Sequence, residues 1–403
     1  MPHAAGAPNV ACTEQPGVPW RRRISRLADP GFEETISTDS TASSARAADQ
    51  SVKRGDAPIY LVWEEVDAIP DEGYDRFSGE LVKALGAIHP VISHATPKKI
   101  PGRAGVRFIV RQLSMLAAVR KLASHGRRPR AIVYASRHEL TVPGLLRARL
   151  LRWFGRAPLV IMVLVPNHAS RPALRLLRWL APEGILLGTE REIATVRRHG
   201  VDAELIWSGV DTSRFRPGDE AEKRSLRRHY GLPTEDRIVL HVGHLRGSRG
   251  LEALLPLGST AGITVLLVVS HRRWPDSEQV KAELERHGVV VMEGYQARVE
   301  EIYRLADCYV FPGGDDRAVS LPLSILEAAA SGLPVVSVRY EAVPERLAAV
   351  DGIEFVEDSS LIPARVLAVM GSRRAARELP AELGWDGVAR TVLAAVESAI
   401  QRR

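Results

Sequence analysis

The feature that most constrains the fold is an alternation of short apolar runs with longer segments of helical periodicity. Runs such as Ile59–Val62, Leu159–Val165 and Ile263–Val269 have the length and the Val, Ile and Leu content of buried parallel strands. Strands are also expected at Pro90–Ser93, Ala131–Tyr134, Ile185–Leu187, Ala203–Ile206, Ile238–Val242, Val289–Met292, Cys308–Phe311 and Val335–Val338. Helices are expected at Tyr74–Leu85, Val106–Ala123, Leu145–Phe154, Ala173–Leu180, Glu190–His199, Glu278–His287, Val299–Leu305 and Leu321–Ala330. This alternation predicts βαβ units and parallel sheets.

The alternation breaks at Trp207–Gly218, where glycines and a proline punctuate the sequence and no period continues. A chain of 403 residues is also longer than one typical domain. We therefore expect two doubly wound α/β domains, residues 57–208 and 209–384, facing across a cleft that holds the ligand. Residues 385–403 are expected to form a helix that packs back toward the first domain. Residues 1–56 lack a hydrophobic period and are expected to be a disordered tail.

Composition narrows the class of protein. The net charge is +7 without a long basic run, and aromatic residues make up only 5%, so nucleic acid is not an expected partner. Cys12 and Cys308 do not have the spacing of metal ligands, and a reducing compartment is expected. No run reaches the roughly 18 apolar residues of a membrane span, and the N-terminus lacks the apolar core of a signal peptide. These features predict a cytoplasmic protein.

The segment Phe311–Val336 is the strongest indication of a site. It has the pattern of a strand end, a glycine-rich turn, a short helix and a second buried strand. Free N–H groups at such a helix start suit phosphate. Glu327 lies within the otherwise apolar helix, where a carboxylate is costly unless it is paired or meets a polar ligand. Phosphate at the helix start and a hydroxylated sugar at Glu327 are one interpretation. An ordinary strand–turn–helix unit with Glu327 reaching solvent is the other.

A second glycine-rich loop, Gly243–Gly250, follows the expected strand Ile238–Val242. Its glycines allow close backbone approach to a ligand, and His244, Arg246 and Arg249 bring cationic or donor groups to the strand end. The loop lacks both the Gly-Lys-Ser/Thr ending of a Walker loop and the G-x-G-x-x-G fingerprint.

The order of features is more specific than any single feature. It runs through Gly209-Val210-Asp211, Phe215-Arg216-Pro217, Gly243–Gly250, Glu293-Gly294, Ala306-Asp307, Phe311-Pro312, Leu323–Ala328 and Ser331–Val336. This succession resembles the retaining glycosyltransferases of family 4, the group 1 family, which have the GT-B fold of two Rossmann-like domains. The resemblance is strong over residues 203–348, is weak over 57–202 and does not cover 1–56.

The resemblance implies a role for each matching residue. Glu327 would bind the donor ribose, and His244 and Arg249 would neutralise the donor diphosphate beside Gly243. The backbone at Leu323 and Ser324 would hold phosphate and sugar hydroxyls. The backbone at Glu293 and Gly294 would contact the nucleobase.

Two positions depart from the family pattern. Val319 stands where the family has a carboxylate that contacts the hexose, and Asp315 or Asp316 are candidates to supply it instead. His244 stands where the family has Arg, so its charge at neutral pH depends on a bound anion.

The first domain is expected to bind the acceptor. His168 follows an expected strand and is the candidate that lies near the transferred sugar, with His138 as its competitor. Asp71–Tyr74 lies where the family has an acceptor-side loop, but it is poorer in glycine. The helical segments Leu145–Arg156 and Arg171–Trp179 mix Arg with Leu and Trp. They are either a peripheral membrane surface or amphipathic helices with Arg on the solvated face.

The expected activity is transfer of a sugar from a nucleotide-diphosphate sugar to an acceptor hydroxyl, with Arg249, Glu327 and His168 as the catalytic candidates. Neither a metal nor a cofactor is expected, because cationic side chains and a helix start would stabilise the leaving diphosphate. Two alternatives stay open: a binding or regulatory subunit that has lost transfer, and a sugar-nucleotide epimerase of the same fold. The sequence does not identify the base, the sugar or the acceptor.

Overall fold

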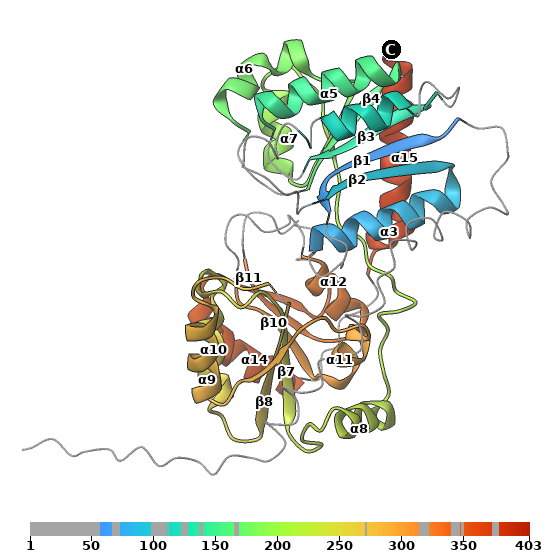
Figure 1. Ribbon diagram of the computed structural model, residues 1–403. Coiled ribbons are helices and arrows are strands. Elements are labelled where there is room, and N and C mark those ends of the chain that lie inside the picture. The colour runs from blue at the N-terminus through green and yellow to red at the C-terminus, as the bar shows by residue number, and fades with distance from the viewer. Residues whose placement is uncertain are drawn as a thin grey trace, which may run out of the picture.

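The computed structural model describes residues 57–66, 73–97, 110, 113–121, 128–136, 140–164, 169–270, 272–313, 322–339, 347, 350–372 and 379–403. Within these residues the chain forms two parallel six-stranded sheets, one from each half of the sequence. Figure 1 shows the sheets as two separate units, each with helices around it. The α/β class and the two Rossmann-like domains expected from the alternating pattern are confirmed. The expected tail, residues 1–56, lies outside the described residues.

The N-terminal sheet has the order β2-β1-β3-β4-β5-β6. Its strands are β1 (Ile59–Val66), β2 (Val91–Pro97), β3 (Ala131–Ser136), β4 (Leu159–Val163), β5 (Gly184–Leu187) and β6 (Glu204–Leu205). Its helices are α3 (Gly73–Ile88), α5 (Val142–Gly155), α6 (Arg171–Leu180) and α7 (Glu190–Arg197). Alternate residues of β1 are buried on opposite faces: Leu61 and Trp63 pack toward α3, and Tyr60 and Val62 pack toward α5. A strand buried on both faces requires a nearly continuous apolar run, as the sequence shows.

The C-terminal sheet has the order β9-β8-β7-β10-β11-β12, which is the doubly wound Rossmann order. Its strands are β7 (Arg237–Gly243), β8 (Ile263–Val269), β9 (Val290–Glu293), β10 (Cys308–Phe311), β11 (Val335–Val338) and β12 (Ile353–Val356). Its helices are α8 (Glu220–His229), α9 (Leu255–Gly258), α10 (Ser277–Arg286), α11 (Val299–Leu305), α12 (Leu323–Ala330) and α14 (Ile362–Ser372), with 3₁₀ turns at Gly247–Arg249 and Leu251–Leu254. The strand order reverses between β7 and β10, so ligands of such a sheet bind beyond the carboxyl ends of these two strands.

Helix α15 (Trp385–Gln401) packs against α3 and against strands β3, β4 and β5 of the N-terminal sheet. The segment before this helix meets the connection between the two sheets, because Val210 donates its backbone N–H to the carbonyl of Leu383 at 2.8 Å. A Cβ on Gly209 would lie 2.8 Å from the ring of Trp385, so only glycine fits at this crossing. The two halves are therefore joined by two adjacent segments of chain.

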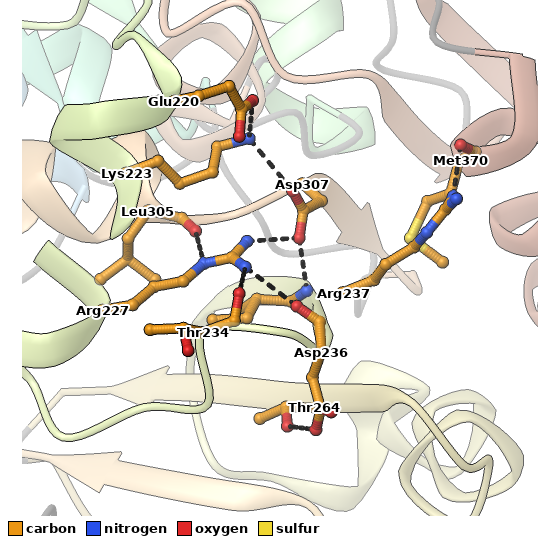
Figure 2. A network of polar contacts seen from close by, with 11 residues as sticks. Glu220, Lys223, Arg227, Thr234, Asp236, Arg237, Thr264, Leu305, Asp307 and Met370 are labelled. Atoms are coloured by element: carbon orange, nitrogen blue, oxygen red, sulfur yellow. Dashed lines mark hydrogen bonds and ion pairs between the residues drawn. The ribbon is translucent and has the colours of Figure 1, made fainter. Parts of the chain in front are cut away.

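A buried polar network secures the amino ends of the C-terminal strands (Figure 2). Arg227 of α8 is buried and donates to the carboxylate of Asp307 at 2.5 Å and to the carbonyl oxygens of Leu305, Thr234 and Asp236. The same carboxylate accepts from the backbone N–H of Ile238 at 2.7 Å. Asp307, one of the residues that carried the family resemblance, thus fastens α8 to the beginning of the sheet.

Candidate functional site

Two loops meet where the strand order of the C-terminal sheet reverses. Gly243 ends β7 and begins the loop to Gly250, while Pro312 follows β10 directly. Gly250 has a φ of +67°, and a Cβ at this position would lie 2.8 Å from the carbonyl oxygen of Pro312. Both the backbone conformation and the close approach require glycine. The fold therefore brings together the two glycine-rich loops that the sequence analysis identified separately.

The side chains of His244 and Arg249 lie side by side on the first of these loops. The distance between Arg249 Nη2 and His244 Nδ1 is 3.4 Å. The His244 ring packs against Trp274 with centroids 4.7 Å apart, and Asp276 accepts the backbone N–H of Gly247 at 2.8 Å. A guanidinium is always a donor, so His244 accepts at this distance only when its Nδ1 carries no proton.

Behind this pair lies His241, a buried residue that the sequence analysis did not single out. Its Nδ1 is 2.8 Å from the carbonyl oxygen of Val310, so Nδ1 carries the proton and donates it. Burial and the charge of nearby Arg249 lower the pKa of His241 to about 4, although the hydrogen bond to Val310 acts in the opposite direction. The imidazole is therefore neutral at physiological pH. Its strand position gave no sign of this role, because it lies within an apolar run.

The start of α12 lies at the same strand ends. Pro322 precedes the helix without a side-chain cap, and the first N–H groups of a helix have no intrahelical acceptor. Ser324 lies near buried Tyr309 of β10, whose hydroxyl donates to the carbonyl of Val242 at 3.4 Å. The side chain of Leu323 instead packs with the apolar cluster of the N-terminal domain. The helix start is thus fixed by both domains.

Glu327 is buried on α12 and has two side-chain partners. Tyr303 of α11 donates its hydroxyl to Oε2 at 2.8 Å, and Nη2 of Arg76 lies 2.7 Å from Oε1. Burial and the Glu327 carboxylate hold the pKa of Tyr303 well above its usual value, so the phenol stays a donor. The sequence analysis placed Glu327 here but missed Arg76, which belongs to α3 of the other domain. No local pattern could have indicated a contact between residues so far apart in the chain.

The segment Glu293-Gly294 follows β9 on the other side of the glycine loop. The Glu293 carboxylate is held by Arg273 and by Lys281, each at 2.6 Å. Burial alone would lower the pKa of Lys281, but its hydrogen bond to Glu293 and the nearby carboxylates together outweigh burial and raise it. Gly294 has a φ of +98°, and its N–H donates to the carbonyl of Val269 at 3.1 Å. The side chain of Glu293 is thus engaged, and the segment has only backbone groups left for a ligand.

A second polar cluster lies at the carboxyl ends of β1 and β3, where the N-terminal sheet reverses its order. Glu64 is buried, forms an ion pair with Arg147 of α5 and accepts from Tyr134 at 2.5 Å and from Ser136 at 3.4 Å. Burial lowers the pKa of Arg147 to about 10. These residues carry no motif and were not predicted. The cluster lies in the domain where the acceptor is expected.

Several predicted residues lie outside the described residues, so their positions stay predictions. They are His168, His138, Val319, Asp315, Asp316, Asp71 and Glu72. Within the described part of the chain, no group of three or more His, Cys, Asp or Glu side chains could hold a metal ion. Within the same part, no helix is long and apolar enough to cross a membrane.

Sequence comparison gives a family for the C-terminal half. Residues 236–370 match the family model "Glycosyl transferases group 1". A D-inositol 3-phosphate glycosyltransferase of Segniliparus rotundus is 31% identical over 197 residues, which cover 46% of this chain and 42% of that protein. The D-inositol 3-phosphate glycosyltransferase of Mycobacterium bovis is 26% identical over 401 residues, which cover 93% of this chain and 76% of that protein. The alignments with the first relatives thus span about two fifths of their length.

Structure comparison extends the likeness to the whole fold. The crystal structure of Anabaena Alr3699/HepE in complex with UDP and glucose has a TM-score of 0.57 and 14% identity, covering 85% of this chain and 97% of that one. The structure of WaaG, a glycosyltransferase involved in lipopolysaccharide biosynthesis, has a TM-score of 0.52 and 14% identity, covering 85% and 98%. Because the sequence identity is so low, these similarities show only a shared fold.

Proposed function

The chain belongs to the group 1 glycosyltransferases and has the two-domain GT-B fold, and from this premise we propose that it transfers a sugar from a nucleotide-diphosphate donor to an acceptor hydroxyl. We further propose that the reaction retains the anomeric configuration and needs no metal ion. The observation that carries the proposal is the meeting of Arg249, His244, the start of α12 and Glu327 at the carboxyl ends of β7 and β10.

The diphosphate would lie between Arg249 and the start of α12. A guanidinium can bind two phosphate oxygens at once, and a helix start adds free N–H groups with a partial positive charge. These groups act on the charge that develops as the sugar–phosphate bond breaks, where preorganised donors contribute most. His244, beside Arg249, would add a second cation when the anion is bound.

The nucleoside would lie between Glu327 and the backbone at Gly294. A carboxylate has about four acceptor positions, and Tyr303 and Arg76 each occupy one on Glu327. Positions therefore remain for the two ribose hydroxyls. HepE was crystallised with UDP, so UDP-sugars are the first donors to test, followed by GDP-sugars.

The acceptor would bind to the N-terminal domain, with His168 near the transferred sugar. We propose that this domain also rests on the cytoplasmic face of a membrane through α5 and α6, which pack together. Trp153 is 70% exposed and Trp179 is 76% exposed, and Leu146, Leu150 and Leu176 are also exposed. Arg149 of α5 and the three arginines of α6 are exposed, whereas Arg147 and Arg152 of α5 are paired with Glu64 and Glu183. Exposed Trp among Leu and Arg suits the headgroup region of an anionic bilayer.

The membrane surface is tested by sedimentation with vesicles. The protein should pellet with phosphatidylglycerol vesicles, and the double variant Trp153→Ser with Trp179→Ser should lose most of this binding. Leu367→Ser on α14 removes an exposed apolar side chain elsewhere and is the matched control. Equal vesicle binding by the double variant and the wild type would contradict membrane binding through α5 and α6.

The transfer function is tested with UDP- and GDP-sugars and lipid or cyclitol acceptors. Glu327→Ala should abolish turnover or raise the donor KM, because the ribose loses its acceptor. The control is Glu300→Ala on α11, which removes another carboxylate from the same domain. Glu300 pairs with Arg214. Full activity of Glu327→Ala would show that the donor site lies elsewhere.

A further inference from the structure

Arg76 is the residue through which the N-terminal domain reaches the donor side of the C-terminal domain. It lies in the first turn of α3, and 26% of its side chain is exposed. Its Nη2 lies 2.7 Å from Oε1 of Glu327, and its guanidinium carbon lies 6.0 Å from the ring centre of Phe215. Figure 1 shows α3 next to α12, the helix that carries Glu327. The contact therefore crosses between the domains.

The position of Arg76 is set by a rigid element. Helix α3 is anchored by Phe77, whose ring packs edge-on against Trp385 of α15 with centroids 5.3 Å apart. Tyr74 on the same helix donates its hydroxyl to the carbonyl of Ala135 at 3.2 Å. Arg76 follows Tyr74 by two residues and so points away from this anchored face. A side chain held on a packed helix can place its charge with little entropy cost.

The electrostatic environment couples Arg76 to the nucleoside side of the site. Burial alone would lower the pKa of Arg76, but the Glu327 carboxylate together with Tyr303, Tyr295 and Glu80 outweighs burial and raises it. Tyr295 follows Gly294, in the segment where we place the base. The guanidinium therefore lies among the groups proposed to surround the nucleoside.

The two partners of Glu327 come from different domains. Tyr303 belongs to the C-terminal domain, as Glu327 does, whereas Arg76 belongs to the N-terminal domain. A carboxylate that loses one of its two side-chain contacts is held less firmly in one orientation.

We propose that Arg76 is a positioning residue of the donor site, which orients Glu327 toward the ribose hydroxyls when the two domains are together. The proposal rests on the transferase function proposed above and deepens it. Because binding and closure are linked, each favours the other by the same factor. Donor ribose would thus be recognised across the domain boundary, with Glu327 as the contacting group and Arg76 acting through it.

The test compares ribonucleotides with analogues that lack the hydroxyls. Dissociation constants are measured by calorimetry for UDP and GDP and for their 2′,3′-dideoxy counterparts. The proteins are the wild type, Arg76→Ala, Arg76→Lys and the control Lys83→Ala, which removes an exposed cation from the same helix. Arg76→Lys retains the positive charge, so it can be measured in place of Arg76→Ala if that variant does not fold.

The inference predicts that Arg76→Ala weakens binding of the preferred ribonucleotide about 10- to 100-fold, as expected for loss of a charged hydrogen bond. The dideoxy analogue should be affected much less, so that the preference for ribose falls. Arg76→Lys should recover part of this preference, and Lys83→Ala should match the wild type.

Three outcomes would overturn the inference. Tighter binding by Arg76→Ala would mean that Arg76 blocks the site. An equal loss for the ribonucleotide and the dideoxy analogue would mean that Arg76 supports only the fold or the phosphates. In both cases binding by the wild type leaves the proposed function standing. If the wild type binds neither UDP nor GDP, the donor assignment itself fails, and the inference fails with it.

Discussion

The two ends of the C-terminal sheet both gather arginines, but they use them differently. At the amino ends, Arg227 is enclosed by carbonyl oxygens and by the carboxylate of Asp307 (Figure 2). At the carboxyl ends, Arg249 lies beside two imidazoles, His244 and His241. Arg227 is held by acceptors of the protein itself, whereas Arg249 lies beside imidazoles on the loop where we propose that the diphosphate binds. The comparison predicts a role in stability for one end and a role in ligand binding for the other.

The largest expected effect is on stability and comes from the amino end. Arg227→Ala leaves the Asp307 carboxylate and several carbonyl oxygens without their donor. Breaking a buried pair of this kind should lower the free energy of unfolding by about 3–5 kcal/mol, measured by urea denaturation. Lys223→Ala removes the outer partner of Asp307, at 3.0 Å, and should cost less than about 1 kcal/mol. Similar losses from both variants would contradict the structural role of Arg227.

The second effect is on binding and comes from the carboxyl end. Arg249→Ala should weaken binding of a nucleoside diphosphate by about 2–3 kcal/mol, because charged hydrogen bonds to phosphate are lost. The free energy of unfolding should change little. Arg246→Ala removes a cation from the same loop and separates a general charge effect from a specific contact. The comparison between the two ends breaks down if Arg249→Ala lowers stability as much as Arg227→Ala.

The third effect concerns pH and His241. The pKa of His241 is about 4 in the folded protein, whereas the ordinary pKa of a histidine is 6.5. As the pH falls, the unfolded chain therefore binds the proton before the folded protein does. The free energy of unfolding should therefore fall from pH 7 to pH 5, and His241 should account for about 2 kcal/mol of this fall. His241→Asn keeps a donor toward Val310 and should lose that part of the pH dependence. Identical pH profiles for variant and wild type would show that burial does not hold this imidazole neutral.

The smallest effect comes from two glycines with nearly the same backbone conformation. Gly250 has a φ of +67° and lies against the carbonyl of Pro312, whereas Gly262, before β8 at the amino end, has a φ of +74° and open space around its Cβ position. Gly262→Ala should cost only backbone strain, about 1 kcal/mol. Gly250→Ala should cost more and should also weaken nucleotide binding, because the loops must separate. Equal melting temperatures and equal nucleotide affinities for the two variants would count against close contact of the loops.

Sequence predicted the elements that are buried on both faces. The runs Ile263–Val269, Cys308–Phe311 and Val335–Val338 are strands with the expected bounds, because a continuous apolar run at this length has few other uses. Helix α8 was missed because its sequence is almost wholly polar and Arg227 is its one buried residue. Strand β12 was missed because two of its four residues are only partly buried. Helix α14 was also missed, although buried residues such as Val366 lie on it.

The candidate site was predictable only where glycine or charge marks the sequence locally. Gly243, His244, Arg249 and Glu327 are visible in this way, and the fold places their elements around one point of strand reversal. Arg76 has no motif around it, since its partner lies in the other domain. The Glu64 cluster was hidden for a similar reason, because its members come from β1, β3 and α5.

The most direct test of the donor site is a thermal-shift panel with UDP, GDP, ADP, dTDP and CDP. A ligand that binds only the folded protein stabilises it by about 2.7 kcal/mol at 100 times its Kd, which is readily measured. The account predicts that one nucleotide stands out, that Arg249→Ala and Glu327→Ala both lose its shift, and that Lys223→Ala keeps it. The absence of any shift, or a shift that survives both Arg249→Ala and Glu327→Ala, would contradict a nucleotide-sugar site at the carboxyl ends of β7 and β10.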